Sequence, residues 1–387
     1  MDASEYAALR IDHSEIAYRR SFQRVRHTGL PTLTVICLQR HTPRLRVRSA
    51  DLWRIVLISK SLCALLAAMS ICSAHADTFT FGLWGDMPYA KANDNPRLPA
   101  LIKSMNKSNI AFSLYDGDIK DGSSQCSDAI FDDAITLFGQ FKKPVVYVPG
   151  DNEWTDCHRL NNGGYDNLER LARLRQTMFN STRSFGQSSL VLEHQGAPGS
   201  AFAENTRFAH KGVVFVGLNI PGSNNNKVLD DKDCSNKSAR TPAQCDADNA
   251  EYADRDAANI KWLHESFVTA AKQKAKGLVV VFQADPGFDL PETEDLDESQ
   301  APQYAGYRNF MQQLVSETEQ FKGQVLLVHG DTHFFKLDKP LYSPTKLLPN
   351  LTRLETFGSP SIHWVHVTVD TRRPEVFTVR PVIVKQP

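Results

Sequence analysis

The sequence predicts an α/β domain over residues 77–387, and three observations carry that prediction. Short runs of β-branched and aromatic residues alternate with helical patterns of apolar residues between residues 77 and 328. After residue 328 the patterns are mainly those of strands. No internal repeat, low-complexity segment or linker divides this stretch, so one layered α/β domain is expected. Its 311 residues are enough to bury a full hydrophobic core.

Strands and helices alternate in the first part of this domain. The strands are predicted at residues 77–84, 111–115 and 144–148. A helix is predicted over residues 95–107, where apolar residues recur on one face. Ser127 or Asp128 is placed to cap a second helix that ends near Phe138.

The second part continues with the same alternation and ends in strands. Helices are predicted at residues 165–179, 253–272 and 304–321. Strands are predicted as short segments within 189–219 and at 277–282, 324–328, 351–357, 364–369 and 376–384. The polar stretch Ser223–Asn249 is interpreted as an insertion loop. The acidic stretch Pro286–Gln303 is interpreted as a mobile rim, or alternatively as a solvated loop without a role.

Acidic side chains follow five of the predicted strands, directly after each strand ends. They are Asp86 in the first loop, Asp116 and Asp118 in the second, Asp151 in the third, Asp285 in the fourth, and Asp331 between His329 and His333 in the fifth. Ligands of α/β sheets bind outside the carboxyl ends of the strands. We therefore expect one shared site built from these five loops.

The residue types in these loops are those that hard or borderline divalent cations prefer. Aspartate supplies charge and can bridge two ions, while histidine and asparagine supply neutral ligands. Two ions about 3.5–4 Å apart can hold a phosphate and activate a water molecule between them. A single Gly-Asp pair is a weak signal, but this ordered series of loops is a strong one.

In these motifs the sequence resembles the calcineurin-like metallophosphoesterase superfamily, which includes the purple acid phosphatases. The family pattern is Asp-x-His, Gly-Asp, Gly-Asn-His-Glu/Asp, a histidine before a proline-rich loop, and Gly-His-x-His. The corresponding segments here are Asp86-Met87-Pro88, Gly117-Asp118, Gly150-Asp151-Asn152-Glu153, Gln283-Ala284-Asp285-Pro286 and Gly330-Asp331-Thr332-His333. The resemblance extends from Asp77 to Val384, and it implies a four-layer α/β/β/α sandwich with mixed sheets and a binuclear metal site.

Five family positions carry different residues in this chain. The first-motif histidine is Pro88, the metal-binding asparagine is Asp151, the catalytic histidine is Asn152, the fourth-motif histidine is Ala284, and the first histidine of the final pair is Asp331. The site is thus rich in aspartate, which favours Mn, Mg or Ca over Zn. The expected cofactors are two divalent ions, with Mn, Fe, Mg, Ca and Zn all open.

The resemblance also implies roles for individual residues. Asp86, Asp118 and His333 would hold the first ion, and Asp118, Asp151 and Asp331 the second. The catalytic candidates are Asn152, His329 and Asp331. Because an asparagine cannot act as a general acid near neutral pH, His329, His158 and Tyr89 are candidates for a compensating role. Tyr89, Lys120 and Asn152 are the candidates for binding substrate.

Residues 1–76 are predicted to lie outside the working domain. The apolar run at 62–72 follows Arg54 and Lys60 and precedes Ala74-His75-Ala76, which is the pattern of a secretory signal cleaved after Ala76. We interpret the residues before it as an over-extended gene start, with translation beginning near Leu52. The alternative is a genuine cytosolic extension with a signal-anchor.

Charge and cysteine usage agree with an exported domain. Residues 1–76 hold 11 of the 44 Lys and Arg residues but only 5 of the 44 Asp and Glu residues, so residues 77–387 carry a net charge of −6. Such a domain presents no evident nucleic-acid-binding surface. Cys126, Cys157, Cys234 and Cys245 remain after cleavage, and an even number suggests two disulfides. Of three possible pairings, Cys126–Cys157 and Cys234–Cys245 are favoured.

Two functions therefore compete. The first is an exported phosphoesterase, periplasmic or secreted, that acts on small phosphate mono- or diesters and has no membrane span in its mature chain. The second is a catalytically weak or silent binding protein of the same fold, which the missing histidines suggest. The sequence gives no indication of the oligomeric state.

Overall fold

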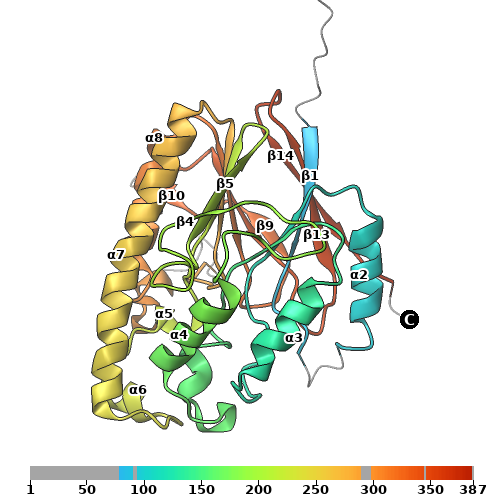
Figure 1. Cartoon of the computed structure of the whole chain (residues 1–387). Helices are drawn as coiled ribbons and strands as arrows, with labels where there is room; N and C mark the ends of the chain where they lie inside the picture. Colours follow the sequence, from blue (N-terminus) through green and yellow to red (C-terminus); the bar gives the residue numbers. More distant parts are fainter. Residues whose placement is uncertain (1–77, 90–93, 289–297, 344–345, 386–387) are drawn as a thin grey trace, which may run out of the picture. The chain divides into compact units, whose positions relative to one another are not determined.

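The computed structural model describes residues 78–89, 94–288, 298–343 and 346–385. Within these ranges two β-sheets lie face to face, with helices on the outer side of each (Figure 1). The expected four-layer α/β/β/α architecture is therefore confirmed. The signal sequence expected within residues 1–76 and the central part of the acidic rim lie outside the described residues.

The first sheet has five strands in the order β14-β13-β1-β2-β3. Its strands are β1 (Thr78–Trp84), β2 (Ser113–Tyr115), β3 (Val145–Tyr147), β13 (Trp364–Asp370) and β14 (Phe377–Val382). Strands β1, β2 and β3 run parallel, while β13 pairs antiparallel with β1. The loops that leave β1, β2 and β3 therefore emerge at one edge of this sheet.

The second sheet has seven strands in the order β4-β5-β6-β7-β8-β12-β9. Its strands are β4 (Glu193–His194), β5 (Thr206–His210), β6 (Val213–Gly217), β7 (Gly277–Val281), β8 (Gln324–His329), β12 (Leu351–Glu355) and β9 (Lys336–Asp338). The central four, β6, β7, β8 and β12, are parallel. A separate two-stranded ribbon pairs β10 (Tyr342–Ser343) with β11 (Lys346–Leu347).

Alternation along each strand divides the core into three apolar layers. In β7, Val279 and Val281 face the other sheet, where Phe81 and Leu83 of β1 meet them. Their neighbours Leu278 and Val280 pack under the helices instead. Burying side chains on both faces of the central strands explains why these segments are continuously apolar in sequence.

Helices cover the outer face of each sheet (Figure 1). The first sheet is covered by α2 (Leu98–Lys107), α3 (Ala129–Phe138) and α4 (Asn167–Met178), and the second by α7 (Pro242–Lys272) and α8 (Arg308–Gln320). A left-handed turn labelled α5 (Gly222–Asn225) and a short helix, α6 (Asp231–Ser235), precede α7. Single 3-10 turns lie at Thr155–His158, Leu160–Asn162, Glu298–Gln300 and Pro302–Tyr304. No helix among the described residues is both long and apolar enough to cross a membrane.

The interpretation of Ser223–Asn249 as one insertion loop is wrong, because α7 begins at Pro242 rather than near residue 253. A capping box marks this start: Thr241 accepts a hydrogen bond from the backbone of Gln244, whose side chain accepts one from the backbone of Thr241. The first turns of α7 bury polar rather than apolar residues, including Asp248. Apolar periodicity therefore could not find them.

The predicted cap of α3 also differs from the structure. Asp128 occupies the N-cap position, but its side chain makes no capping hydrogen bond. Its carboxylate instead pairs with Arg170 and Arg173 of α4. The side chain thus joins two neighbouring helices rather than satisfying the end of its own.

Candidate functional site

The five predicted loops meet at the edge where the carboxyl ends of the parallel strands of both sheets converge. The backbone N–H of Asp331, after β8, lies 3.2 Å from Oδ1 of Asp86, after β1. Gly330 permits this approach, because a Cβ there would lie 2.0 Å from Oδ2 of Asp86. Gly150 has the same role, since a Cβ at that position would lie 2.1 Å from Oδ1 of Asp118. The glycine before each aspartate therefore reflects close packing between loops of different strands.

Asp86, Asp118 and His333 form one cluster in which the possible metal-ligating atoms all lie within 4.8 Å of one another. Both aspartates are buried, and His333 is partly exposed. Nδ1 of His333 lies 2.7 Å from the carbonyl oxygen of Ser359, which leaves Nε2 facing Oδ1 of Asp86 at 3.5 Å. Histidines that bind metals are oriented by such a hydrogen bond from the other ring nitrogen. The donor set and its orientation fit a divalent cation.

Four of the candidate metal ligands share an uncommon backbone conformation. Asp86, Asp118, Asp331 and His333 all have positive φ, at 48°, 62°, 75° and 66°. Non-glycine residues adopt this region at a cost, and such residues concentrate at functional sites. Four of them in contacting loops indicate that the fold holds these side chains in place against local preference.

The electrostatics of the cluster favour a bound cation. Burial, followed by the charges of Asp151 and Asp86, raises the pKa of Asp118 well above its usual range. Burial and the nearby Asp151 carboxylate likewise raise the pKa of Asp331. Burial lowers the pKa of His333, but the hydrogen bond and charge of Asp86 outweigh it and raise that pKa to about 9. Without a metal ion, a proton on His333 balances part of this negative charge, and a cation would replace it.

Asp151 and Asp331, the further ligands expected for a second ion, lie on either side of Gln283. Nε2 of Gln283 is 3.4 Å from Oδ1 of Asp151 and 3.2 Å from Oδ1 of Asp331. Its Oε1 accepts a hydrogen bond from the N–H of Gly222 at 2.6 Å, which fixes the direction of the amide. A neutral N–H donor thus occupies the position between two carboxylates. The second ion fits less well here than the first.

Gln283 and Ala284, adjacent residues of the fourth motif, lie in different environments. Ala284 is buried in the apolar layer under the helices of the second sheet, so it does not face the site. From this loop the side chain of Gln283 enters the site, between Asp151 and Asp331. Successive residues of an extended segment point to opposite faces, so the one-residue difference decides which of the two reaches the carboxylates.

The remaining predicted residues divide into two groups. Oη of Tyr89 donates to Oδ2 of Asp118 at 2.6 Å, and Nδ2 of Asn152 donates to the same oxygen at 2.5 Å. These two side chains therefore contact a candidate metal ligand. Lys120 is buried and donates to the carbonyl of Asp121 at 2.8 Å, and burial lowers its pKa. It lines a different cavity, beside α2 and α3.

His329 lies among apolar and cationic neighbours. Its ring is near those of Phe282 and Phe288, and Nε2 is 3.4 Å from Nη1 of Arg353. Its fully buried ring also approaches Asp285 and Glu355. These contacts favour a role of His329 in packing and charge balance rather than in catalysis.

Sequence reasoning missed Ser223, which enters the site from the loop after β6. Its Oγ donates to Oδ2 of Asp151 at 2.8 Å and contacts Oδ1 of Asp156 at 2.7 Å. The sequence feature that could have indicated a turn here is the segment Gly222-Ser223-Asn224-Asn225-Asn226, whose residue types are typical of tight turns. No charged residue marked it as part of the site.

Both favoured disulfides, Cys126–Cys157 and Cys234–Cys245, are present. The first joins the loop after β2 to the loop after β3. Both of its sulfur atoms lie near the carbonyl oxygen of Asn152, at 3.5 and 3.7 Å. It therefore supports the segment that carries Asp151 and Asn152. Glu153 supports the same turn, accepting hydrogen bonds of 2.7 Å from Tyr147 and from the N–H of Gly150.

Comparison with known proteins assigns no family. No family model and no curated protein matches the sequence. Among solved structures, the chain is similar to PhoD at a TM-score of 0.45 and 11% identity, covering 76% of this chain and 64% of that one. It is similar to TT1561 of Thermus thermophilus at a TM-score of 0.39 and 10% identity, covering 80% and 100%. It is also similar to the 5'-nucleotidase from Candida albicans SC5314 at 0.37 and 11% identity, covering 79% and 51%. These scores are too low to assign a function, which is therefore inferred from the residues of the site.

The environment of His158 gives a prediction about stability. Burial, together with the charges of Arg240 and Arg159, lowers the pKa of His158 from 6.5 to about 3. Between these values the unfolded chain binds a proton that the folded chain does not, so stability falls as the pH is lowered. We expect His158 to account for a loss of about 2 kcal/mol in unfolding free energy between pH 6.5 and pH 5. Urea denaturation across this range measures it.

The variants for this measurement are His158→Gln and, as a control, His264→Gln. His264 is 57% exposed, and its ion-pair partner among the described residues is Glu317, at 2.7 Å. The slope of stability against pH should flatten in His158→Gln and stay as in the wild type in His264→Gln. Equal slopes in all three proteins would show that the pKa of His158 is the same in the folded and in the unfolded chain.

Proposed function

We propose that this protein is an exported, metal-dependent phosphoesterase that hydrolyses small phosphate mono- or diesters. The observation that carries the proposal is the cluster of Asp86, Asp118 and His333, with Nε2 of the histidine aimed at the carboxylates by the carbonyl of Ser359. The motif resemblance supplies the reaction class. Two disulfides are consistent with export.

The chain's own residues would hold and orient the cofactor. Asp86, Asp118 and His333 would bind one divalent ion, and Asp118, Asp151 and Asp331 a second. Bound ions of this kind stabilise the charge that develops on phosphate oxygens and lower the pKa of water. Tyr89 and Asn152 each donate to Asp118 and so fix the orientation of its carboxylate. Asn152 carries no proton that it could give to a leaving group near neutral pH.

A second function, a weak or silent binding protein, is favoured by one specific observation. The amide of Gln283 lies between Asp151 and Asp331, where the second ion would need both carboxylates free. A site limited to one ion could bind a phosphorylated ligand without efficient turnover. The number of ions per chain therefore separates the two functions.

The test combines elemental analysis with hydrolysis assays on the purified protein. Chromogenic phosphate mono- and diesters would be supplied with Mn, Mg, Ca, Zn or Fe in turn. About two ions per chain and turnover that depends on them would support the esterase and distinguish mono- from diesterase. One ion or none, without turnover under any metal, would favour the binding protein.

A further inference from the structure

A cavity of about 360 Å³ lies next to the candidate metal centre and is lined in part by Asp331. Its charged lining residues are three cations, Arg159, Lys227 and Arg240, and four aspartates, Asp156, Asp233, Asp285 and Asp331; Ser223 and other, mostly polar, side chains line the rest. The lining thus includes one candidate metal ligand, Asp331, together with a set of cations. No proposed step of phosphoester hydrolysis uses these cations.

A left-handed turn builds one wall of this cavity. Ser223, Asn224, Asn225 and Asn226 are consecutive residues with φ of 50°, 56°, 58° and 62°. This conformation costs about 1–2 kcal/mol for each residue with a side chain, so the surrounding structure must hold it. Arg255 does so from α7, where its fully buried guanidinium donates to the carbonyl oxygens of Asn219 and Asn225 at 3.0 and 2.9 Å.

The turn is also held from α8. Oη of Tyr307, at the N-cap of α8, donates to the carbonyl of Pro221 at 3.1 Å, and the N–H of Asn225 donates to the same Oη at 3.2 Å. The result is that Ser223 contacts the candidate metal ligand Asp151 while Lys227, just after the turn, lines the cavity. A rigid strained segment therefore links the two parts of the site.

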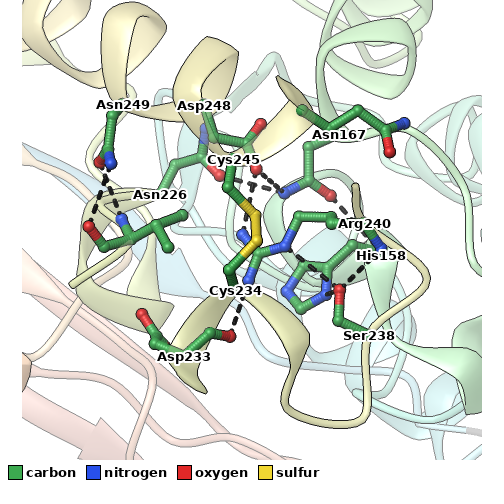
Figure 2. A network of polar contacts seen from close by, with 12 residues as sticks. His158, Asn167, Asn226, Asp233, Cys234, Ser238, Arg240, Cys245, Asp248 and Asn249 are labelled. Atoms are coloured by element: carbon green, nitrogen blue, oxygen red, sulfur yellow. Dashed lines mark hydrogen bonds and ion pairs between the residues drawn. A yellow bond between two sulfur atoms is a disulfide. The ribbon is translucent and has the colours of Figure 1, made fainter. Parts of the chain in front are cut away.

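Arg240 is fixed in place by its neighbours (Figure 2). Its Nη1 pairs with Asp248 at 3.0 Å, Nη2 donates to the carbonyl of Asp233 at 3.2 Å, and Nε donates to Oγ of Ser238 at 3.2 Å. The same Oγ is 2.9 Å from Nδ1 of His158. Charge from Arg240 and Arg159 helps to lower the pKa of His158, which agrees with a positive potential at this wall.

Arg159 and Lys227 are more open to a ligand. Arg159 is 37% exposed; it pairs with Asp156 at 2.5 Å and its Nη2 donates to Ser223 at 3.1 Å. The ammonium of Lys227 lies 5.1 Å from the ring centroid of Tyr252. Within the described part of the chain, Lys227 forms no ion pair. Its positive charge is therefore available to an anion.

We propose that this cavity is a subsite for a second phosphate group of the substrate, held chiefly by Arg159 and Lys227. The substrate class is then a small phosphoester that carries a further phosphate. The inference rests on the proposed hydrolysis for the identity of the first phosphate. A phosphate dianion, with three acceptor oxygens and nearly two charges, suits several convergent cations better than a singly charged carboxylate.

Binding to the metal-free protein tests the subsite without any turnover. The chelator-treated full chain would be titrated with inorganic phosphate, and binding followed by ³¹P line broadening. Without metal the candidate centre has no metal ion that could hold phosphate, so the signal reports the cavity. We expect Arg159→Gln and Lys227→Gln each to weaken binding by about tenfold, since each removes a charged hydrogen-bond donor. Acetate should bind the wild type at least about fivefold more weakly than phosphate.

The matched control is Lys261→Gln, which removes an equal charge from a 71% exposed lysine on α7. Its affinity for phosphate should stay within about twofold of the wild type. Circular dichroism would confirm that all variants are folded. Unchanged binding in the Arg159→Gln/Lys227→Gln double variant, or equal binding of acetate and phosphate, would overturn the proposal.

Kinetics of the metal-loaded protein give the second readout. KM for a bisphosphorylated ester such as fructose 1,6-bisphosphate should rise about tenfold in either variant, while KM for p-nitrophenyl phosphate should not change. If both esters are turned over but the variants do not raise KM for the bisphosphorylated ester selectively, the subsite proposal is wrong and the esterase proposal stands. If the protein shows no turnover but binds phosphate through Arg159 and Lys227, the esterase proposal is wrong and the cavity remains a phosphate-binding site.

Discussion

Asp118→Asn is expected to abolish phosphoester hydrolysis, with turnover falling by at least about a thousandfold. Loss of groups that merely orient a metal ligand costs 10- to 100-fold, and Asp118 is itself a proposed ligand of both ions. It accepts hydrogen bonds from Tyr89 and Asn152 and lies in the cluster with Asp86 and His333. Asparagine keeps the size of the side chain but removes the charge that a cation requires. Metal content per chain, measured by elemental analysis, should fall together with turnover.

The stability of the metal-free protein distinguishes this effect from misfolding. Burial and neighbouring carboxylates raise the pKa of Asp118, so its charge is unfavourable when no cation is bound. The metal-free Asp118→Asn variant should therefore unfold at the same temperature as the metal-free wild type, or at a higher one. Asp133→Asn on the exposed side of α3 is the control and should alter neither turnover nor metal content. Wild-type turnover in Asp118→Asn would exclude the proposed centre.

Removal of the Cys126–Cys157 disulfide is expected to reduce both stability and metal binding. The bond joins residues 31 positions apart, and closing a loop of that length stabilises a folded chain by about 3–4 kcal/mol. The two sulfur atoms also lie against the carbonyl oxygen of Asn152, beside Asp151. A Cys126→Ala/Cys157→Ala variant should lose about 3–4 kcal/mol in urea unfolding. Its folded fraction should bind metal more weakly than the wild type.

The second disulfide provides a matched control. Cys234–Cys245 spans 11 positions and links α6 to the start of α7. The variant Cys234→Ala/Cys245→Ala should lose about 3 kcal/mol of stability, and neither cysteine contacts the carboxylate cluster. Its folded fraction should therefore bind metal as the wild type does. If both double variants bind metal equally, the first disulfide has no particular role in the site.

The sequence predicted the strands and the candidate metal cluster because both are local properties. Buried strands are short, apolar and β-branched, and parallel strands deliver their following loops to one edge. Acidic residues directly after several strands therefore had to converge. Asp86, Asp118 and His333 lie together for this reason. Local patterns did not indicate that the side chain of Gln283 lies between Asp151 and Asp331, because they cannot tell which of two adjacent side chains at a strand end faces a neighbouring loop.

Buried polar residues are a second feature that apolar periodicity in the sequence does not detect. The first turns of α7 are helical although their buried positions hold Cys245 and Asp248. Asp248 is stabilised there by Arg240 and by Asn167 of α4. Apolar periodicity records only side chains that avoid water, so it misses a helix face whose buried groups are satisfied by hydrogen bonds.

The sequence by itself indicated the layered α/β fold, the main strand segments along the chain and the aspartates that follow five of them. Tertiary structure alone decided that Ser223 contacts Asp151 and that Lys227 lines the neighbouring cavity. They follow β6 in a segment without apolar periodicity, and they are positioned by a left-handed turn that Arg255 stabilises from a helix 30 residues further along the chain. That turn is unfavourable in isolation. It exists because buried hydrogen bonds from α7 and α8 outweigh its conformational cost, and no local pattern encodes such a balance.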